Sequence, residues 1–129
     1  MLDTIQHDSD ILELRLARPP VNALDPELTR TLRTAIASAP AHGARGIVLS
    51  GRPGMYSGGL DVPVLLPLDR AALTAFLTDF FELCGTIAAS RVPIVAAITG
   101  HSPAGGAVLS IFCDYRIMAR SVDPAKPFR

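Results

Sequence analysis

The chain has 129 residues, of which twelve are basic and twelve acidic, so it carries no formal net charge at neutral pH. This balance gives no electrostatic reason to expect nucleic acid or an acidic membrane surface as a partner. Two cysteines without a Cys/His zinc spacing favour reduced thiols in a cytoplasmic protein and no metal site.

The apolar content is unusual for so short a chain. Apolar residues make up 49% of the sequence, and a small domain buries a smaller fraction of its surface than a large one. We therefore expect the chain to oligomerise or to belong to something larger. The acidic start predicts no signal peptide, and no apolar stretch approaches the roughly 18 residues that cross a bilayer, so no membrane association is expected.

The first elements follow from alternation and from a helix-start signal. Residues 11–16 alternate between leucine and polar side chains and predict a strand with one wet face. Residues 2–7 are expected to pair with it through the polar turn at 8–10. Asp25 followed by proline marks the start of a helix, which we expect to run to about residue 39.

The second part of the chain repeats the pattern of strand and helix. Residues 45–51 form a short buried strand, and residues 52–67 form a long loop rich in glycine and proline. Asp69 caps a second helix over 70–90, with apolar residues at helical spacing. Residues 93–100 form a fully apolar strand.

A helix over 104–112 and a strand over 114–119 complete the chain. The order β-α-β-α-β-α-β, with apolar later strands, is typical of an α/β layered fold in which most strands pair in parallel. The sequence contains no repeats, low-complexity tracts or linkers, so we expect one domain over residues 1–129.

Two glycine-rich turns follow apolar strands: "GMYSGGLD" and "GHSPAGG". Ligands of parallel sheets bind at the carboxyl ends of strands, and glycine allows close approach to backbone N–H groups. Gly105 lies in the first turn of the predicted helix, where N–H groups lack intrahelical partners. Side by side, the turns would supply two convergent donors, as in an oxyanion hole. The alternative is that these glycines serve only tight packing.

Two other functional motifs do not fit the residues of this sequence. "GHSPAGG" nearly matches the nucleophile elbow G-x-S-x-G with Ser102 as the nucleophile. The residue after that nucleophile must donate its N–H to the oxyanion, but Pro103 has none, and no histidine follows in the chain. The dinucleotide fingerprint G-x-G-x-x-G is absent.

Three segments together resemble the crotonase superfamily, the enoyl-CoA hydratase/isomerase family. They are "RPPVNALDPEL", "MYSGGLDV" and "VPIVAAITGHSPAGGAVLSIFCDYRIMA", in the family's order and over about residues 10–120. The resemblance implies a ββα spiral core of the ClpP/crotonase type, of which this chain would be the amino-terminal half. It also implies an acyl-CoA thioester as substrate, no further cofactor, and a homo-oligomer, a trimer, for a full-length relative.

The resemblance also implies the site residues. The thioester oxygen would be held by the backbone N–H groups of Leu60 and Gly105, which form the oxyanion hole. Residues 57–61 would border the CoA adenine. The expected substrate-binding residues are Ser57, Gly58, Gly59, Leu60, Asp61 and Gly105.

The residue three positions after the oxyanion glycine decides between two chemistries. Family hydratases carry a glutamate there, and this chain has Val108, which cannot handle a proton. The sequence looks most like the mitochondrial-type Δ3-Δ2-enoyl-CoA isomerase branch of fatty acid metabolism, which uses a single glutamate. That glutamate would be expected just beyond Arg129. Asp61 is expected to order its loop, and Asp114 to be a turn or cap residue.

Two alternatives to isomerisation remain open. One is a truncated relative that binds acyl-CoA without catalysis, and the other is different crotonase chemistry such as enoyl-CoA hydration.

Overall fold

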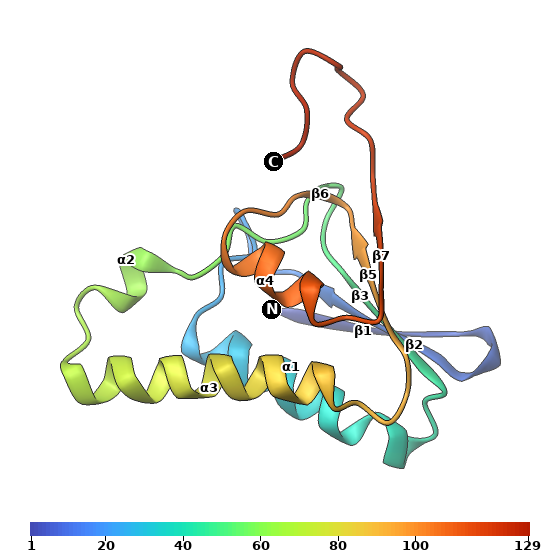
Figure 1. The fold of residues 1–129 in the computed structure, drawn as a ribbon, viewed down its shortest axis with the longest axis horizontal. Coiled ribbons are helices and arrows are strands. Elements are labelled where there is room, and N and C mark those ends of the chain that lie inside the picture. Colours follow the sequence, from blue (N-terminus) through green and yellow to red (C-terminus); the bar gives the residue numbers. More distant parts are fainter.

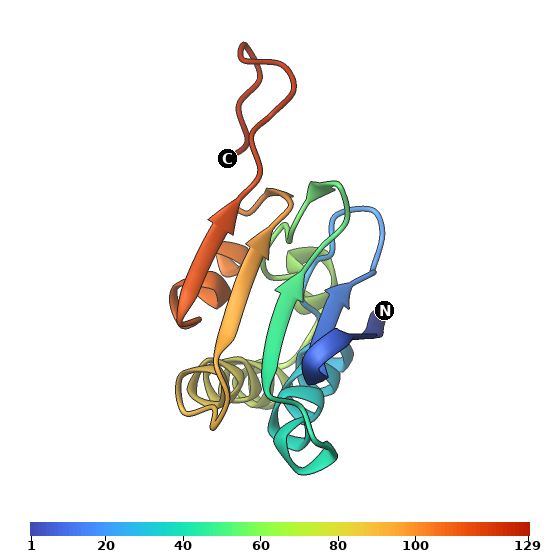
Figure 2. The ribbon, with the colours of Figure 1, turned by 90° about the vertical axis from the view of Figure 1, so that its right-hand side faces the viewer.

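The computed structural model describes residues 1–129. Five strands form the main sheet, in the spatial order β1-β2-β3-β5-β7 (Figure 2). These strands are β1 (Leu2–His7), β2 (Ile11–Leu16), β3 (Gly46–Ser50), β5 (Ile94–Ile98) and β7 (Tyr115–Met118). β1 pairs antiparallel with β2, and every other pair is parallel. The predicted mostly parallel α/β sheet is therefore confirmed.

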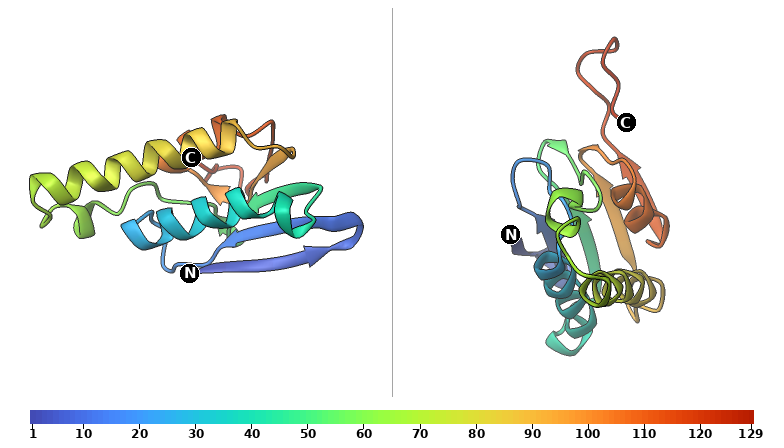
Figure 3. Two further views of the ribbon diagram at one scale, coloured as in Figure 1. Left: turned by 90° about the horizontal axis from the view of Figure 1, so that it is seen from below. Right: turned by 90° about the vertical axis from the view of Figure 1, so that its left-hand side faces the viewer.

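The helices lie on one side of this sheet, and Figure 2 views the sheet from its open face. They are α1 (Pro26–Ser38), α2 (Val62–Leu65), α3 (Arg70–Ala88) and α4 (Gly105–Ile111), with 3-10 turns η1 (Asp8–Asp10) and η2 (Pro40–His42). Helix α2 lies beyond the end of the sheet (Figure 1). The two long helices, α1 and α3, lie side by side below the sheet (Figures 1 and 3).

Both long helices begin where the sequence predicts. The Leu28 N–H donates to the Asp25 carboxylate at 2.7 Å, and the Ala72 N–H donates to Asp69 at 2.8 Å. Such a cap satisfies an N–H group that has no intrahelical partner. The apolar stripes of the two helices then turn toward the sheet. The buried apolar residues are Leu28, Leu32 and Ile36 of α1, and Phe76, Phe80, Leu83, Cys84 and Ile87 of α3.

The core lies between these helices and the sheet. It contains 19 buried residues, and each fully buried Leu or Ile side chain contributes about 1.5–3 kcal/mol. In β5 the side chains of Ile94, Ala96 and Ile98 are buried, whereas Val95 and Ala97 are half-buried on the open face. The strand is thus apolar on both faces but buried on only one.

The predicted loop over 52–67 is wrong in two places. Residues Gly54–Met55 form strand β4, which pairs in parallel with β6 (Gly100–His101), and Val62–Leu65 form α2. A two-residue strand has no periodicity to detect. The Asp61 carboxylate accepts from the Val64 N–H and caps α2, with proline in the first turn.

Helix α3 corrects the expectation about membrane-spanning length. By length and composition alone, this 19-residue helix could cross a membrane. However, its acids Asp79 and Glu82 form ion pairs with Arg30 and Arg33 of α1, and five of its side chains are buried. A buried core helix passes the same test, so we assign α3 to the layer that covers the sheet.

The edge at β7 and α4 leaves apolar side chains uncovered. The most exposed are Ile111, Phe112, Tyr115, Ile117 and Met118. Exposed apolar patches mark interaction surfaces or aggregation-prone sites. Part of the expected apolar excess is therefore exposed at this edge of the sheet, and further exposed apolar side chains, such as Leu66, Phe81 and Val122, lie elsewhere.

Candidate functional site

The two glycine-rich turns meet beyond the carboxyl ends of β3 and β5, which are neighbours in the sheet. The parallel pairing of β4 with β6 joins the turns, since Gly54 lies opposite Gly100 and Met55 opposite His101. The Tyr56 N–H also donates to the His101 carbonyl at 2.9 Å. Sequence reasoning placed both turns at this end of the sheet, and the structure brings them together.

The backbones approach most closely at Gly59 and Gly105. A Cβ atom on Gly59 would lie 2.9 Å from the Gly105 nitrogen, and one on Gly105 would lie 3.2 Å from the Leu60 nitrogen. Gly59 also has a φ of +89°, a region that glycine adopts without strain. A Cβ on Gly106 would lie 2.5 Å from the Ser57 carbonyl oxygen. The glycines therefore allow tight packing and place the backbone of Gly59 and Leu60 against that of Gly105.

The direction of the Leu60 N–H follows from its neighbours. The Leu24 N–H donates to the Gly59 carbonyl at 2.7 Å, and the Asp61 N–H donates back to the Leu24 carbonyl at 2.9 Å. The C=O and N–H of a planar trans peptide point in opposite directions. The Gly59 carbonyl points at Leu24, so the Leu60 N–H points away from it.

Neither nitrogen has an acceptor inside the protein. The Leu60 N–H and the Gly105 N–H donate to no backbone or side-chain oxygen, whereas the Gly106 N–H donates to the Pro103 carbonyl at 3.0 Å. An N–H group without a protein acceptor is uncommon, because most backbone groups are paired. Two such donors stand on facing backbones.

Both carboxylate oxygens of Asp61 have partners within the protein. Its carboxylate accepts from the Val64 N–H at the start of α2 and lies 2.6 Å from a guanidinium nitrogen of Arg18. Only 11% of this side chain is exposed. The prediction that Asp61 orders its loop is confirmed by these contacts.

Asp114 is also a structural residue. Its carboxylate accepts from the Ile94 N–H at 2.7 Å, and its own N–H donates to the Ile94 carbonyl at 2.9 Å. These bonds join the chain just before β7 to the start of β5. They lie at the amino ends of the strands, at the opposite end of the sheet from the two glycine-rich turns.

The segment 18–25 is the part of the site whose role sequence reasoning missed. The Asn22 side-chain amide donates to the Met55 and Tyr56 carbonyls at 3.3 and 3.0 Å. Arg18 forms ion pairs with both Asp25 and Asp61. "RPPVNALD" contributed to the family resemblance, but only Asp25, as a helix cap, was given a task. The available signal was an asparagine two residues after a pair of prolines, since these residue types favour defined turns.

Val108 and Ser102 carry no proton chemistry in this arrangement. Val108 is half-buried and packs against the core. Ser102 is buried, and its hydroxyl has no hydrogen-bond partner. The neighbouring His101 accepts at Nδ1 from the Arg129 N–H. Since Ser102 has no base bonded to it, the geometry agrees with the exclusion of a nucleophile elbow.

The ionisable groups behind the site stay neutral. Burial, with a smaller contribution from Asp114, raises the pKa of Cys113 to about 11. Burial also raises the pKa of Tyr56, whose hydroxyl has no hydrogen-bond partner. Neither residue is ionised at neutral pH, so neither supplies a nucleophile or base. No group of three or more His, Cys, Asp or Glu side chains comes together to hold a metal ion.

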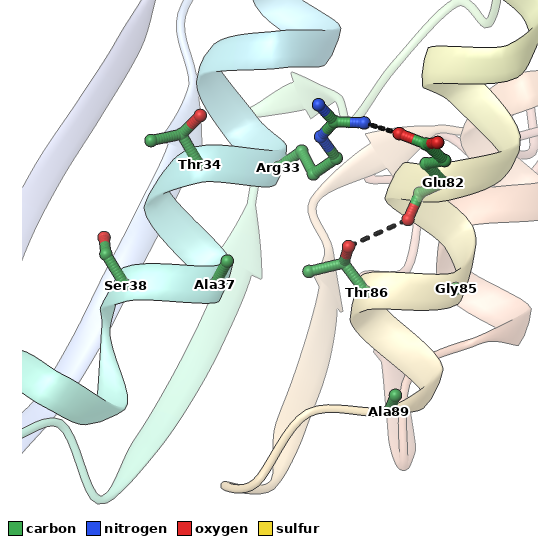
Figure 4. A pocket seen from close by; sticks show the side chains of 8 residues that line it. All are labelled: Arg33, Thr34, Ala37, Ser38, Glu82, Gly85, Thr86 and Ala89. Carbon is green, nitrogen blue, oxygen red and sulfur yellow. Dashed lines mark hydrogen bonds and ion pairs between the residues drawn. The ribbon is translucent and has the colours of Figure 1, made fainter.

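The largest surface hollow lies elsewhere. It has a volume of about 780 Å³ and lies between α1 and α3, where small side chains and the Arg33–Glu82 ion pair line it (Figure 4). It contains none of the residues that the motifs identify. A smaller apolar hollow of about 150 Å³, lined by Val62, Leu65, Leu66 and Leu73, lies beside α2, which directly follows the Leu60 turn.

This arrangement of a parallel sheet and two facing glycine turns has known relatives. The enoyl-CoA hydratase/isomerase family model matches residues 6–128, so the chain belongs to that family. Its fold is the amino-terminal half of the crotonase fold. The crystal structure of human mitochondrial delta3-delta2-enoyl-CoA isomerase superposes with a TM-score of 0.87 at 29% identity, over 93% of this chain and 48% of that one.

Curated sequences of two kinds are similar to this chain. Mitochondrial enoyl-CoA delta isomerase 1 of Rattus norvegicus is 34% identical over 114 residues, which are 87% of this chain and 39% of the relative. The probable enoyl-CoA hydratase echA8 of Mycobacterium tuberculosis is 30% identical over 127 residues, which are 95% and 48%. The chain therefore spans less than half the length of these relatives.

Proposed function

We propose that the protein binds an acyl-CoA thioester and holds its carbonyl oxygen with the N–H groups of Leu60 and Gly105. The reaction that these donors support is the isomerisation of 3-enoyl-CoA to 2-enoyl-CoA. The observation that carries the proposal is that these two donors lie on facing backbones and have no acceptor in the protein. The resemblance to the isomerase branch supports the same two residues. Residues 57–61 would border the nucleotide end of the substrate.

The reaction needs these donors at one step. Removal of a proton from C2 of a 3-enoyl thioester leaves a dienolate whose negative charge lies on the former carbonyl oxygen. Return of a proton at C4 then gives the 2-enoyl thioester. Preorganised N–H groups stabilise that oxygen as its charge develops, and one such donor accounts for about 10²–10³ in rate.

Isomerisation is favoured over hydration by the side chain at position 108. Water addition through paired carboxylates needs an acid on α4, and Val108 supplies only an apolar surface beside the core. Moving a double bond needs no activated water, and a single carboxylate can carry the proton.

The proton carrier is neither Asp61 nor Asp114, the acids of the two motifs that contain the glycine turns. Asp61 is bonded to Arg18 and to the start of α2, and Asp114 is bonded at the far end of β5. We therefore expect the 129-residue chain to bind and polarise the thioester, but to turn over 3-enoyl-CoA no faster than Gly105→Pro. Clear turnover that Asp114→Asn abolishes would contradict this assignment.

Carbonyl polarisation tests the proposal directly. The probe is saturated octanoyl-CoA labelled with ¹³C at the thioester carbon, and the measurement is the infrared C=O stretch of the bound ligand. Two hydrogen bonds to the oxygen should shift the stretch to lower frequency. Gly105→Pro, which removes one donor, should lose about half of the shift, and Gly85→Ala on α3 serves as the control. An unshifted stretch in the bound wild-type complex would overturn the proposal.

The reaction type is tested separately. A chain of this family that carries the same two turns together with a proton carrier should isomerise 3-enoyl-CoA much faster than it hydrates 2-enoyl-CoA. Comparable rates would show that water is activated without an acid at position 108.

A further inference from the structure

Resting on the proposed function, we propose that Arg18 and Asn22 are positioning residues that set the direction of the Leu60 N–H. Both belong to the segment 18–25 that precedes α1, and neither is one of the residues expected to touch the substrate. They act through the turn over 55–61 that carries Leu60.

Arg18 ties together two helix starts. Its guanidinium lies 3.1 Å from the Asp25 carboxylate, which caps α1, and 2.6 Å from the Asp61 carboxylate, which caps α2. It also donates to the Ala23 carbonyl at 3.2 Å. Only 22% of the Arg18 side chain is exposed, so this bridge is poorly screened by solvent. Asp61 is covalently next to Leu60, so the bridge fixes one side of the Leu60 residue.

Asn22 holds the other side of the turn. It is fully buried and adopts a φ of +52°, which asparagine tolerates better than most residues. Its amide donates to the Met55 and Tyr56 carbonyls, and its Oδ1 accepts from the Arg18 N–H at 2.9 Å. The Ser57 hydroxyl donates to the Asn22 carbonyl at 2.8 Å.

Between these two anchors, Leu24 aligns the peptide itself. Its N–H and C=O bond to the Gly59 carbonyl and the Asp61 N–H, on either side of Leu60. The Leu60 N–H therefore points away from Leu24 only while segment 18–25 keeps its register on the turn. A misplacement of about 1 Å can cost 10²-fold in rate, so these ties matter for function as well as for folding.

The chain offers a matched control for Arg18. Arg33 also contacts two carboxylates, those of Asp79 and Glu82, but it does so between α1 and α3. It has no contact with either glycine turn. Removing each guanidinium therefore separates a general cost of breaking an ion pair from a specific effect on Leu60.

The experiment compares Arg18→Met, Arg18→Lys and Arg33→Met in the 129-residue chain. Bound ¹³C-octanoyl-CoA should lose about half of its carbonyl shift in Arg18→Met, and none in Arg33→Met. Arg18→Lys should recover part of the shift, because an ammonium group pairs as a point charge and not as a fork. A full wild-type shift in Arg18→Met would overturn the assignment.

A second measurement needs no ligand. The ¹⁵N–¹H resonance of the Leu60 amide should move in Arg18→Met, while the Gly105 amide stays in place. If Arg18→Met does not fold, Asp61→Asn replaces it, because asparagine keeps the cap and removes the ion pair. An unmoved Leu60 resonance in the folded variant overturns the positioning role. A wild-type protein without any carbonyl shift would instead overturn the proposed function, and the Leu60 resonance would still decide the role of Arg18.

Discussion

The two turns that carry the free N–H groups are held in place by different means. The turn over 51–61 is fixed by polar side chains from a separate segment, chiefly those of Arg18 and Asn22. The turn over 99–106 receives no side-chain tie of this kind, and its bonds to a segment other than the turn over 51–61 are those of the Ser102 N–H and His101 Nδ1 to the backbone of Arg129. It is fixed by backbone contacts so close that Gly100 and Gly106 leave no space for a Cβ atom.

This difference predicts how each turn responds to substitution. Replacing a hydrogen-bonding side chain by a related one costs only part of its stabilisation, because the new side chain keeps some of the hydrogen bonds. A close backbone contact fails abruptly, because any side chain must move the opposing backbone. Substitutions of Gly100 or Gly106 should therefore lower the free energy of unfolding more than substitutions of the side chains that hold the turn over 51–61.

Gly100→Ala should have the largest effect. A Cβ atom there would lie 1.9 Å from the Gly54 carbonyl carbon, so β4 and β6 must separate. We expect a loss of about 3 kcal/mol or more in the free energy of unfolding, at the upper end for overpacking. Urea denaturation followed by circular dichroism measures it. Gly85→Ala is the control, because a Cβ on Gly85 meets nothing within 4 Å and should stabilise α3 by about 0.5–1 kcal/mol. A stable Gly100→Ala protein would contradict the comparison.

The contrast also explains what the sequence could predict. Asp25, Asp69 and the apolar periodicity carry local signals, so the helices and their starts were predictable. The two glycine turns were predictable as neighbours, since each follows an apolar strand of a parallel sheet. The ion pair between Arg18 and Asp61 was not predictable, because a partner more than 40 residues away leaves no local pattern in the sequence.

The short elements were missed for a related reason. β4 and β6 are two residues each, so neither has a hydrophobic period, and their pairing depends on contacts between distant turns. The open face of β5 was missed because its apolar residues match both a strand buried on two faces and one buried on a single face. In both cases tertiary contacts decide what the local sequence leaves open.

Asn22→Ala should rank second. It leaves the Met55 and Tyr56 carbonyls without their donor, at a cost of about 1–3 kcal/mol, and places alanine at a φ of +52°. Asn22→Gly loses the same hydrogen bonds without the backbone strain. The difference between the two variants in urea unfolding therefore measures the strain, which we expect to be about 1 kcal/mol. Equal losses would mean that the hydrogen bonds account for the whole effect.

The helix caps give a smaller contrast. Asp25→Ala removes both a cap and an ion pair with Arg18, whereas Asp69→Ala removes only a cap. A cap alone contributes about 1 kcal/mol, so we expect Asp69→Ala to cost that much and Asp25→Ala to cost up to about 2 kcal/mol. Repeating the measurement in Arg18→Met should remove the difference between the two. If the difference persists, Arg18 contributes nothing through Asp25.

The smallest effect should come from a third polar cluster, on the open face of the sheet. Glu13 is buried in β2, where its carboxylate accepts from the Ser50 hydroxyl and contacts His7 and Arg15. Burial alone would raise the pKa of Glu13, but the hydrogen bonds from Ser50, His7 and Arg15 together hold it below its usual value of 4.5. A lowered pKa stabilises the folded state above pH 4.5, and this contribution is lost as the pH falls through the folded-state pKa. Glu13→Gln should therefore cost about 1 kcal/mol at pH 7, and the difference from wild type should shrink toward zero near pH 2. Urea unfolding at both pH values measures this.

Because the Glu13 cluster joins strands and not a turn, the Leu60 and Gly105 amide resonances should stay in place in Glu13→Gln. If they move as they do in Arg18→Met, the first turn depends on the sheet as a whole and not on the ties from segment 18–25.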